Sequence, residues 1–274
     1  MSVDELASRT AIFGAGVMGE TLLSGLLRAG REPGSLLITE RRADHAAALT
    51  ERYGVDVVGN AEAARAAHVL VLVVKPQDMG DLLAEIRDEV RPGDLVVSLA
   101  AGITTAFLES RLPDGTAVVR VMPNTPALVD EGMAALSPGQ HCSDDQLAVA
   151  EALLASCGKV VRVEEKHQDA VTAISGSGPA YLFYVVEAMI EAGVVLGLPR
   201  ATASELVVQT LVGAGAMLRE TGEHPTVLRE RVSSPGGTTV AALRQLDEHG
   251  VRAAFVNAME AAAQRSHQLA SGSP

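Results

Sequence analysis

The stretch TAIFGAGVMG, Thr10 to Gly19, joins a short apolar run directly to a glycine-rich turn. Four leucines then recur at helical spacing between residues 22 and 27, and a second apolar run, Leu36 to Thr39, leads to Glu40. A strand, a G-x-G-x-x-G turn and a helix, with an acid about twenty residues further on, form the dinucleotide-binding fingerprint. We therefore predict that the turn binds a dinucleotide through Gly14, Ala15, Gly16, Val17, Met18 and Gly19.

The residues that follow the second apolar run bear on the choice of cofactor. Glu40 would accept hydrogen bonds from a ribose diol and favours NADH, whereas Arg41 and Arg42 could bind a 2′-phosphate and favour NADPH. These two arginines are the only adjacent basic pair in a chain whose net charge is −12. We expect NADPH; NADH, or a solvated helix start without any ligand, are the alternatives.

Apolar runs and helical segments continue to alternate up to about residue 165, as in a doubly wound sheet. The run from Val69 to Val74 is apolar throughout, which is typical of a central parallel strand. It ends at Lys75 and Pro76, at the carboxyl edge where ligands of such sheets bind. We predict further strands at Val55–Val58, Leu95–Ala100, Ala117–Met122, Met133–Leu136 and Val160–Val163, and helices at Ala61–Ala67 and Asp81–Val90. We expect PNTP, Pro123–Pro126, to be a rigid turn that cannot continue into a helix and leaves Asn124 and Thr125 projecting.

Beyond about residue 166 the strand-like runs give way to long helices. Ala180 to Leu196 is apolar almost all round, and Glu187 and Glu191 form its one narrow polar stripe. Such a helix must be buried on nearly every side, which a domain of about a hundred residues achieves poorly alone. We predict an α/β dinucleotide-binding domain at residues 1–165 and a helical domain at 166–274 that forms a homodimer.

Two turns rich in serine and glycine precede helices of the second domain. They are SGSGPAY, Ser175 to Tyr181, and SPGGTT, Ser234 to Thr239. Turns of this kind cap helices, and the free N–H groups at a helix start also attract anions. Either turn alone would be capping chemistry, but two in one domain indicate a pocket for a small carboxylate.

Composition and charge disfavour several functional classes. Only 3% of the residues are aromatic and the net charge is −12, which disfavours binding to single-stranded or duplex nucleic acid. Cys142 and Cys157 lack a metal-type spacing and the seven histidines form no ligand motif, so we expect no metal site. The polar start and the short apolar runs of the first half indicate a soluble cytoplasmic protein without a membrane partner.

The motifs GAGVMG, VKP, AAGIT, RVMPNTP, DAVTAISGSGPAY and SPGGTT, in this order, resemble those of pyrroline-5-carboxylate reductases. The resemblance spans about Ala11 to Leu269; GAGVMG is common to many dehydrogenases, but PNTP, SGSGPAY and SPGGTT are specific to the family. It implies an α/β Rossmann-type dinucleotide-binding domain followed by an all-α dimerisation domain, with dimers that assemble further into rings such as a decamer. It also implies reduction of the cyclic imine 1-pyrroline-5-carboxylate to L-proline, by NADPH or NADH, in proline biosynthesis.

The same resemblance implies roles for individual residues. Ser234, Gly237, Thr238 and Thr239 would bind the substrate carboxylate, and Thr172 would be the catalytic residue that hydrogen-bonds the ring nitrogen. The cofactor would contact Asn60, Val74, Lys75, Pro76, Met122 and Asn124. A protonated imine already attracts a hydride, so positioning in a dry cleft suffices without a strong acid. Open alternatives are a hydroxyacid-type dehydrogenase, another cyclic-imine reductase, and a dinucleotide-sensing oligomer without turnover.

Overall fold

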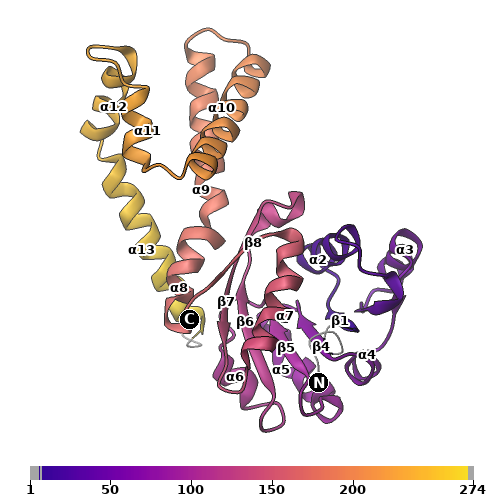
Figure 1. Ribbon diagram of the computed structural model, residues 1–274. Helices are drawn as coiled ribbons and strands as arrows, with labels where there is room; N and C mark the ends of the chain where they lie inside the picture. The colour runs from indigo at the N-terminus through magenta and orange to yellow at the C-terminus, as the bar shows by residue number, and fades with distance from the viewer. Residues whose placement is uncertain (1–5, 7, 271–274) are drawn as a thin grey trace. The chain divides into compact units, whose positions relative to one another are not determined.

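The computed structural model describes residue 6 and residues 8–270, which fall into two compact units (Figure 1). The first unit extends to Ser177 and takes in the chain again from Ala262, and the second is Gly178–Ala261. The predicted boundary between residues 165 and 166 rests on a change of composition, which is a different criterion from compactness. That boundary therefore stays a prediction.

One eight-stranded sheet forms the centre of the first unit, in the order β3-β2-β1-β4-β5-β6-β7-β8. Neighbouring strands are parallel except β6 and β7. The strands are β1 Thr10–Phe13, β2 Leu36–Thr39, β3 Asp56–Val57, β4 Val69–Leu72, β5 Leu95–Ser98, β6 Ala117–Met122, β7 Gly132–Pro138 and β8 Gly158–Arg162. The predicted Rossmann-type α/β fold of this part is confirmed, and the strand order reverses direction between β1 and β4.

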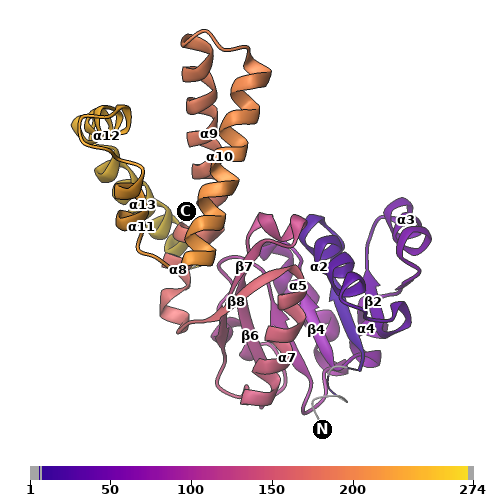
Figure 2. The same cartoon turned by 45° about the horizontal axis from the view of Figure 1, so that its top comes forward.

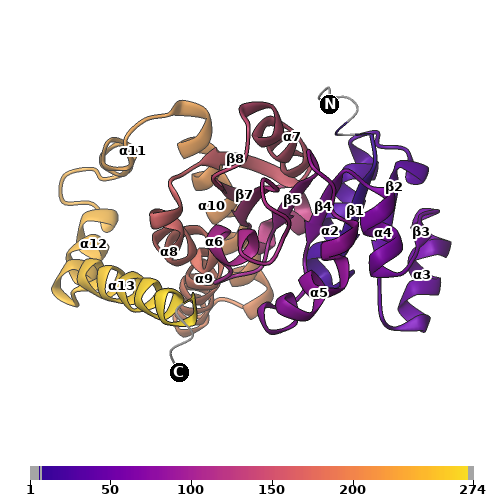
Figure 3. The same ribbon diagram turned by 90° about the horizontal axis from the view of Figure 1, so that it is seen from below.

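The central strands are apolar because helices cover both faces of the sheet (Figure 3). Ile12 of β1 and Val71 of β4 belong to one buried cluster, whereas their neighbours Phe13 and Leu72 belong to the other. The helices α2 Val17–Arg28, α3 Ala43–Tyr53 and α7 Asp144–Leu154 contribute to the first cluster. The helices α4 Asn60–Ala66, α5 Met79–Ile86 and α6 Thr105–Glu109 contribute to the second.

The prediction for PNTP was wrong, because a 3₁₀ helix, η4 Thr125–Val129, begins within it. Pro126 lies in the first turn of this helix, where N–H groups have no partner within the helix, so a residue without an N–H fits there. The side chain of Asn124 does not project freely. It donates from Nδ2 to the carbonyl of Ser175 (3.0 Å) and accepts at Oδ1 from the N–H of Met133 (2.8 Å).

The last part of the first unit contains a short helix, α8 Gln168–Val171, and a π-helical turn, η7 Thr172–Gly176. The chain returns to this region near its end, in α13 Val251–Ala270. There Ser266 donates to a carboxylate oxygen of Asp169 in α8 (2.6 Å). The end of α13 is thereby fixed to α8.

The second unit is entirely helical and contains α9 Gly178–Val195, α10 Arg200–Thr221, α11 Pro225–Arg231, α12 Thr238–Glu248 and the first part of α13 (Figure 2). Helices α9 and α10 pack closely, with Ala203 placed against the bare Cα of Gly193. Much of their apolar surface is uncovered: Phe183 is 66% exposed and Val195 is 86% exposed. By length and composition alone, Glu165–Val195 and Arg200–Thr221 could each cross a membrane, which is weak support for a membrane protein.

Candidate functional site

A cavity of about 430 Å³ lies at the carboxyl ends of β1, β2 and β4. The strand order reverses between β1 and β4, and open α/β sheets bind their ligands at such a point. The cavity is lined by Gly14, Ala15, Gly16, Thr39, Glu40, Arg41, Arg42, Asn60, Val73, Val74, Lys75, Asp78, Asp81, Leu82 and Glu85. Its position and size suit the adenosine and pyrophosphate part of a dinucleotide.

The glycines of the turn after β1 have different tasks. Gly14 has φ +100°, and a Cβ on Gly19 would overlap the carbonyl oxygen of Gly14. Both glycines are therefore required by the path of the backbone. At Gly16 an added Cβ would meet nothing within 4 Å, which leaves open space beside the N-terminus of α2. As N-cap, Gly16 has no side chain to cover the free N–H groups of this helix, so they can receive an anion.

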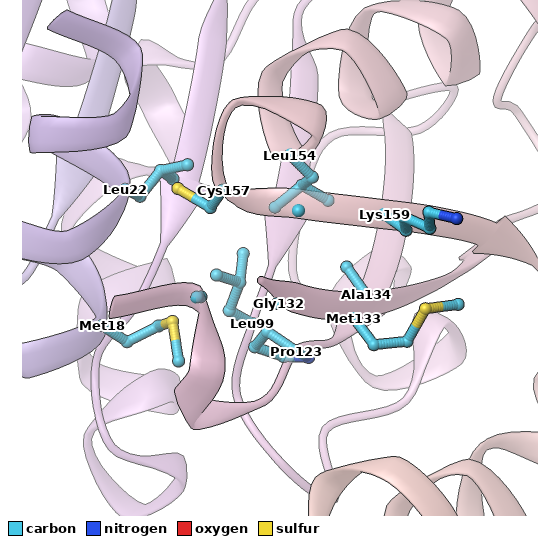
Figure 4. Close-up of a pocket in the computed structure, with 12 residues that line it drawn as sticks. Met18, Leu22, Leu99, Pro123, Gly132, Met133, Ala134, Leu154, Cys157 and Lys159 are labelled. Atoms are coloured by element: carbon cyan, nitrogen blue, oxygen red, sulfur yellow. The ribbon is translucent and has the colours of Figure 1, made fainter. Parts of the chain in front are cut away.

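Not all predicted fingerprint residues line the cavity. Val17 is 71% exposed, and Met18 lies at a separate apolar crevice between α2, η4, β7 and β8 (Figure 4). Pro123, Met133 and Cys157 line the same crevice. Its volume, about 20 Å³, suits no more than a water molecule, so we assign it no ligand.

Glu40 is almost enclosed at the rim of the cavity, with a side chain that is 10% exposed. Its Oε1 accepts the N–H of Arg42 (2.8 Å), and its Oε2 lies 3.0 Å from Nδ1 of His45. Partial burial acts to raise the pKa of Glu40, but these hydrogen bonds and the Arg42 guanidinium lower that pKa to below its ordinary value. Glu40 is therefore ionised at neutral pH.

Two polar side chains of the cavity are bound by acids that also line it. Arg41, whose side chain is 85% exposed, donates to Asp78 (3.2 Å), and Asn60 donates to Glu85 (2.8 Å). Asp78 ends η2 Pro76–Asp78, which follows Lys75 directly. Pro76 starts that short helix and is not part of the lining. The cavity acids Asp78, Asp81 and Glu85 were not among the predicted site residues, although Asp78 follows the VKP motif by only two residues.

Three other predicted residues gather around the π-helical turn η7. Met122 is the last residue of β6, and its methyl group lies against Gly176. A Cβ added to Gly176 would lie 2.5 Å from that methyl carbon. Asn124 binds the carbonyl of Ser175, and the Thr172 hydroxyl donates to the carbonyl of Gln168 (2.8 Å). π-Helical turns are frequent at functional sites. Met122, Asn124 and Thr172 do not line the cavity itself.

The four residues predicted for the substrate carboxylate lie together at the start of α12 in the second unit. Gly237 is the N-cap, and its N–H donates to the carbonyl of Ser234 (2.9 Å). A Cβ on Gly237 would lie 2.6 Å from the Ser234 hydroxyl, so the turn is tightly closed. Thr238 and Thr239 are the first residues of the helix, where free N–H groups favour an anion. In the described part of the chain no three His, Cys, Asp or Glu residues are grouped to bind a metal ion.

Known proteins resemble this chain over nearly its full length. Residues 165–269 match the family model for pyrroline-5-carboxylate reductase dimerisation, and residues 9–102 match that for NADP oxidoreductase, coenzyme F420-dependent. The pyrroline-5-carboxylate reductase of Corynebacterium melassecola is 48% identical, over 94% of this chain and 97% of that protein. Its counterpart in Bacillus subtilis, pyrroline-5-carboxylate reductase 1, is 38% identical, over 95% and 89%.

Solved structures agree with these matches. A pyrroline-5-carboxylate reductase from Coxiella burnetii has a TM-score of 0.92 at 36% identity and covers 96% of this chain and 98% of its own. The Plasmodium falciparum pyrroline carboxylate reductase with NADP bound has a TM-score of 0.85 at 30% identity, with coverage of 96% and 98%.

Proposed function

The chain belongs to the pyrroline-5-carboxylate reductase family, and from that premise we propose that it transfers a hydride from NADPH to 1-pyrroline-5-carboxylate to give L-proline. The observation that carries this proposal is the 48% identity to a relative of that name over nearly the whole of both chains. The reaction makes the protein an NAD(P)H-dependent oxidoreductase of proline biosynthesis. A dehydrogenase of hydroxyacids has no comparable support.

The residues of the cavity fit a dinucleotide. The open space beside Gly16 and the uncapped start of α2 suit a pyrophosphate, and Arg41 and Arg42 offer two guanidinium groups at the rim. Asn60, Val74 and Lys75 would contact the remainder of the cofactor. The bound nicotinamide would supply the hydride, and the protein supplies binding and orientation. We assign NADPH rather than NADH because of the arginine pair.

Thr172 would act on the imine nitrogen as an acceptor. Its hydroxyl proton is already donated to the carbonyl of Gln168, so the oxygen presents lone pairs and no free proton. Such an oxygen stabilises a protonated imine, which carries an N–H and a positive charge, and this is the form that a hydride attacks. The carboxylate of a substrate would bind the hydroxyl groups and N–H groups at Ser234, Gly237, Thr238 and Thr239.

The proposal is tested by steady-state oxidation of NADPH and of NADH with 1-pyrroline-5-carboxylate as substrate. We expect turnover with the imine, a higher kcat/KM with NADPH, and none with 2-keto acids. Binding of a dinucleotide without oxidation would instead support a sensor. Turnover of 2-keto acids would support a hydroxyacid-type dehydrogenase.

Replacement of both Arg41 and Arg42 by alanine should raise the KM for NADPH by about tenfold or more, because about one to two charge-assisted hydrogen bonds to the 2′-phosphate are lost. The KM for NADH should stay within about twofold of its original value, because NADH lacks that phosphate. Arg65→Ala is the control, since Arg65 pairs with Glu89 and is not part of the cavity lining. Equal losses for the two cofactors would contradict the assignment.

The exposed apolar faces of α9 and α10 are the basis for proposing a homodimer through the helical unit. Patches of this kind on a soluble protein mark association surfaces, and this part of the chain matches the dimerisation domain of the family. We expect light scattering to give a mass of at least twice 28.4 kDa, with no stable monomer. Five such dimers would make the decamer that we also propose. A well-folded monomer at micromolar concentration would contradict the dimer.

We also propose that these helices face another copy of the chain and not a lipid bilayer, so that the protein works in the cytoplasm. Glu187 and Glu191 are exposed in the middle and second half of α9. Ionisable side chains at the centre of a bilayer are costly. A second copy can cover the apolar side of α9 and leave both glutamates in water.

A further inference from the structure

A histidine that the proposed chemistry does not use lies beside the cofactor cavity. His45, in the first turn of α3, is between two carboxylates: Nδ1 is 3.0 Å from Glu40 Oε2 and Nε2 is 3.7 Å from Glu20 Oε2. Glu20 belongs to α2, the helix that follows the glycine turn, and Glu40 directly follows β2. The imidazole therefore lies between α2 and Glu40, and of these two Glu40 lines the cavity.

The proton on His45 can be placed from its partner. An ionised carboxylate only accepts hydrogen bonds, so we assign a hydrogen to the Nδ1 that lies 3.0 Å from Glu40, and this nitrogen then donates to Glu40. The other oxygen of Glu40 accepts the N–H of Arg42 (2.8 Å). The Arg42 guanidinium lies 3.5 Å from Glu40 Oε1. Its 2.9 Å contact with Nδ1 of His45 is not a hydrogen bond in this tautomer, because a guanidinium only donates and Nδ1 already donates to Glu40. Both oxygens of Glu40 are thus bound by donors of the protein.

The far side of the imidazole is fixed as well. Glu20 accepts hydrogen bonds from Arg52 (2.9 Å) and from the hydroxyl of Tyr53 (2.8 Å), both at the end of α3. Partial burial and the hydrogen bond to Glu20 raise the pKa of Tyr53, so that it stays a donor at neutral pH. Glu20 is held in place by these two contacts, and it faces the Nε2 edge of the ring. The orientation of His45 toward Glu40 is therefore built into the packing of α3 on α2.

We propose that His45 is a positioning residue that makes the cavity compatible with NADPH. Its hydrogen bond to Glu40 would make that carboxylate less able to bind a ribose diol or to repel a 2′-phosphate. An unattached carboxylate after the second strand of such a fold binds the ribose diol of NADH and repels a 2′-phosphate. A carboxylate bound by His45 and by the Arg42 N–H has fewer free lone pairs for the diol, and its charge is partly compensated. This inference rests on the proposed preference for NADPH.

The test is calorimetric titration of the full-length protein with NADP⁺ and with NAD⁺, which measures binding without turnover. In His45→Ala the ratio of the two dissociation constants should move toward NAD⁺ by about tenfold, equivalent to one hydrogen bond to a charged group. His45→Asn places an amide N–H near the position of Nδ1 and should keep the ratio within about threefold. His68→Ala is the matched control, because His68 also binds a carboxylate, Asp94 (2.8 Å), but Asp94, unlike Glu40, does not line the cavity.

A double variant of His45 and Glu40 distinguishes a positioning role of His45 from a merely structural one. In a Glu40→Gln background, His45→Ala should leave the ratio unchanged, because the carboxylate through which His45 acts is gone. An unchanged ratio in His45→Ala alone, equal shifts in the alanine and asparagine variants, or a full shift in the Glu40→Gln background would each overturn the proposal. If His45→Ala does not fold, His45→Leu, which keeps most of the volume, takes its place in the comparison.

Failure of the proposed function would look different. Tighter binding of NAD⁺ than of NADP⁺ by the unaltered protein would contradict the assigned cofactor. A lack of turnover of the imine would contradict the assigned activity. The role of His45 is measured as a change in the ratio of dissociation constants between variants, so its failure can be told apart from failure of the assigned cofactor or activity.

Discussion

Gly19→Ala is expected to lower kcat/KM with NADPH by about a hundredfold or more and to destabilise the fold by about 1–3 kcal/mol. An alanine Cβ at this position would overlap the carbonyl oxygen of Gly14, which is backbone and cannot rotate away. Helix α2 must then move away from the turn after β1. A displacement of about 1 Å is enough to misplace the N–H groups that would bind the pyrophosphate.

Two neighbouring substitutions isolate the cause of this effect. In Gly16→Ala the new Cβ has no neighbour within 4 Å, and alanine can adopt the extended backbone of this position (φ −66°, ψ −175°). The melting temperature should therefore be unchanged, while NADPH binding weakens because the Cβ fills space beside the N-terminus of α2. Gly34→Ala, also without close neighbours and located before β2, should change neither. Thermal melting and steady-state kinetics measure both quantities. Normal activity and stability of Gly19→Ala would show that α2 does not need this close approach.

Strands buried on both faces were the most predictable part of the fold. The bounds of β2 and β6, Leu36–Thr39 and Ala117–Met122, agree to the residue, although β6 contains Arg120, which pairs with Glu165. Helix α7 was not predicted, although Ser143 and Gln146 form a capping box at its start. Strands β6 and β7 are antiparallel because the connection between them is too short for a crossover. No single residue in the sequence indicates this reversal of direction.

The site residues that belong to a sequence motif could be predicted, whereas those brought together only by tertiary packing could not. The start of the glycine turn, Gly14–Gly16, and the arginine pair follow from sequence spacing, and both line the cavity. Asp78, Glu85 and His45 belong to no motif, and only the folded chain shows which basic, amide or acidic groups they contact. The sequence also could not show that both the amide nitrogen and the amide oxygen of Asn124 are hydrogen-bonded, since one partner, Ser175, lies 51 residues further along the chain.

Asn124→Asp is expected to lower kcat/KM about a hundredfold at neutral pH while leaving most of the stability intact. The new carboxylate still accepts the N–H of Met133 through one oxygen. Its second oxygen would face the carbonyl of Ser175 in place of the amide that now donates to it at 3.0 Å. Two acceptors repel at that distance, so the π-helical turn that begins at Thr172 must move, and the proposed contact to the imine nitrogen moves with it.

A pH profile distinguishes this mechanism from general damage. A protonated carboxyl carries an O–H that can donate to the Ser175 carbonyl, so the activity of Asn124→Asp relative to the unaltered protein should rise as the pH falls. Asn124→Ala loses both hydrogen bonds, leaves the Met133 N–H without its partner, and should cost about 1–3 kcal/mol of stability with no such recovery. If Asn124→Asp is fully active at neutral pH, the π-helical turn does not depend on this side chain, and Thr172 is positioned by its own hydrogen bond to Gln168 alone.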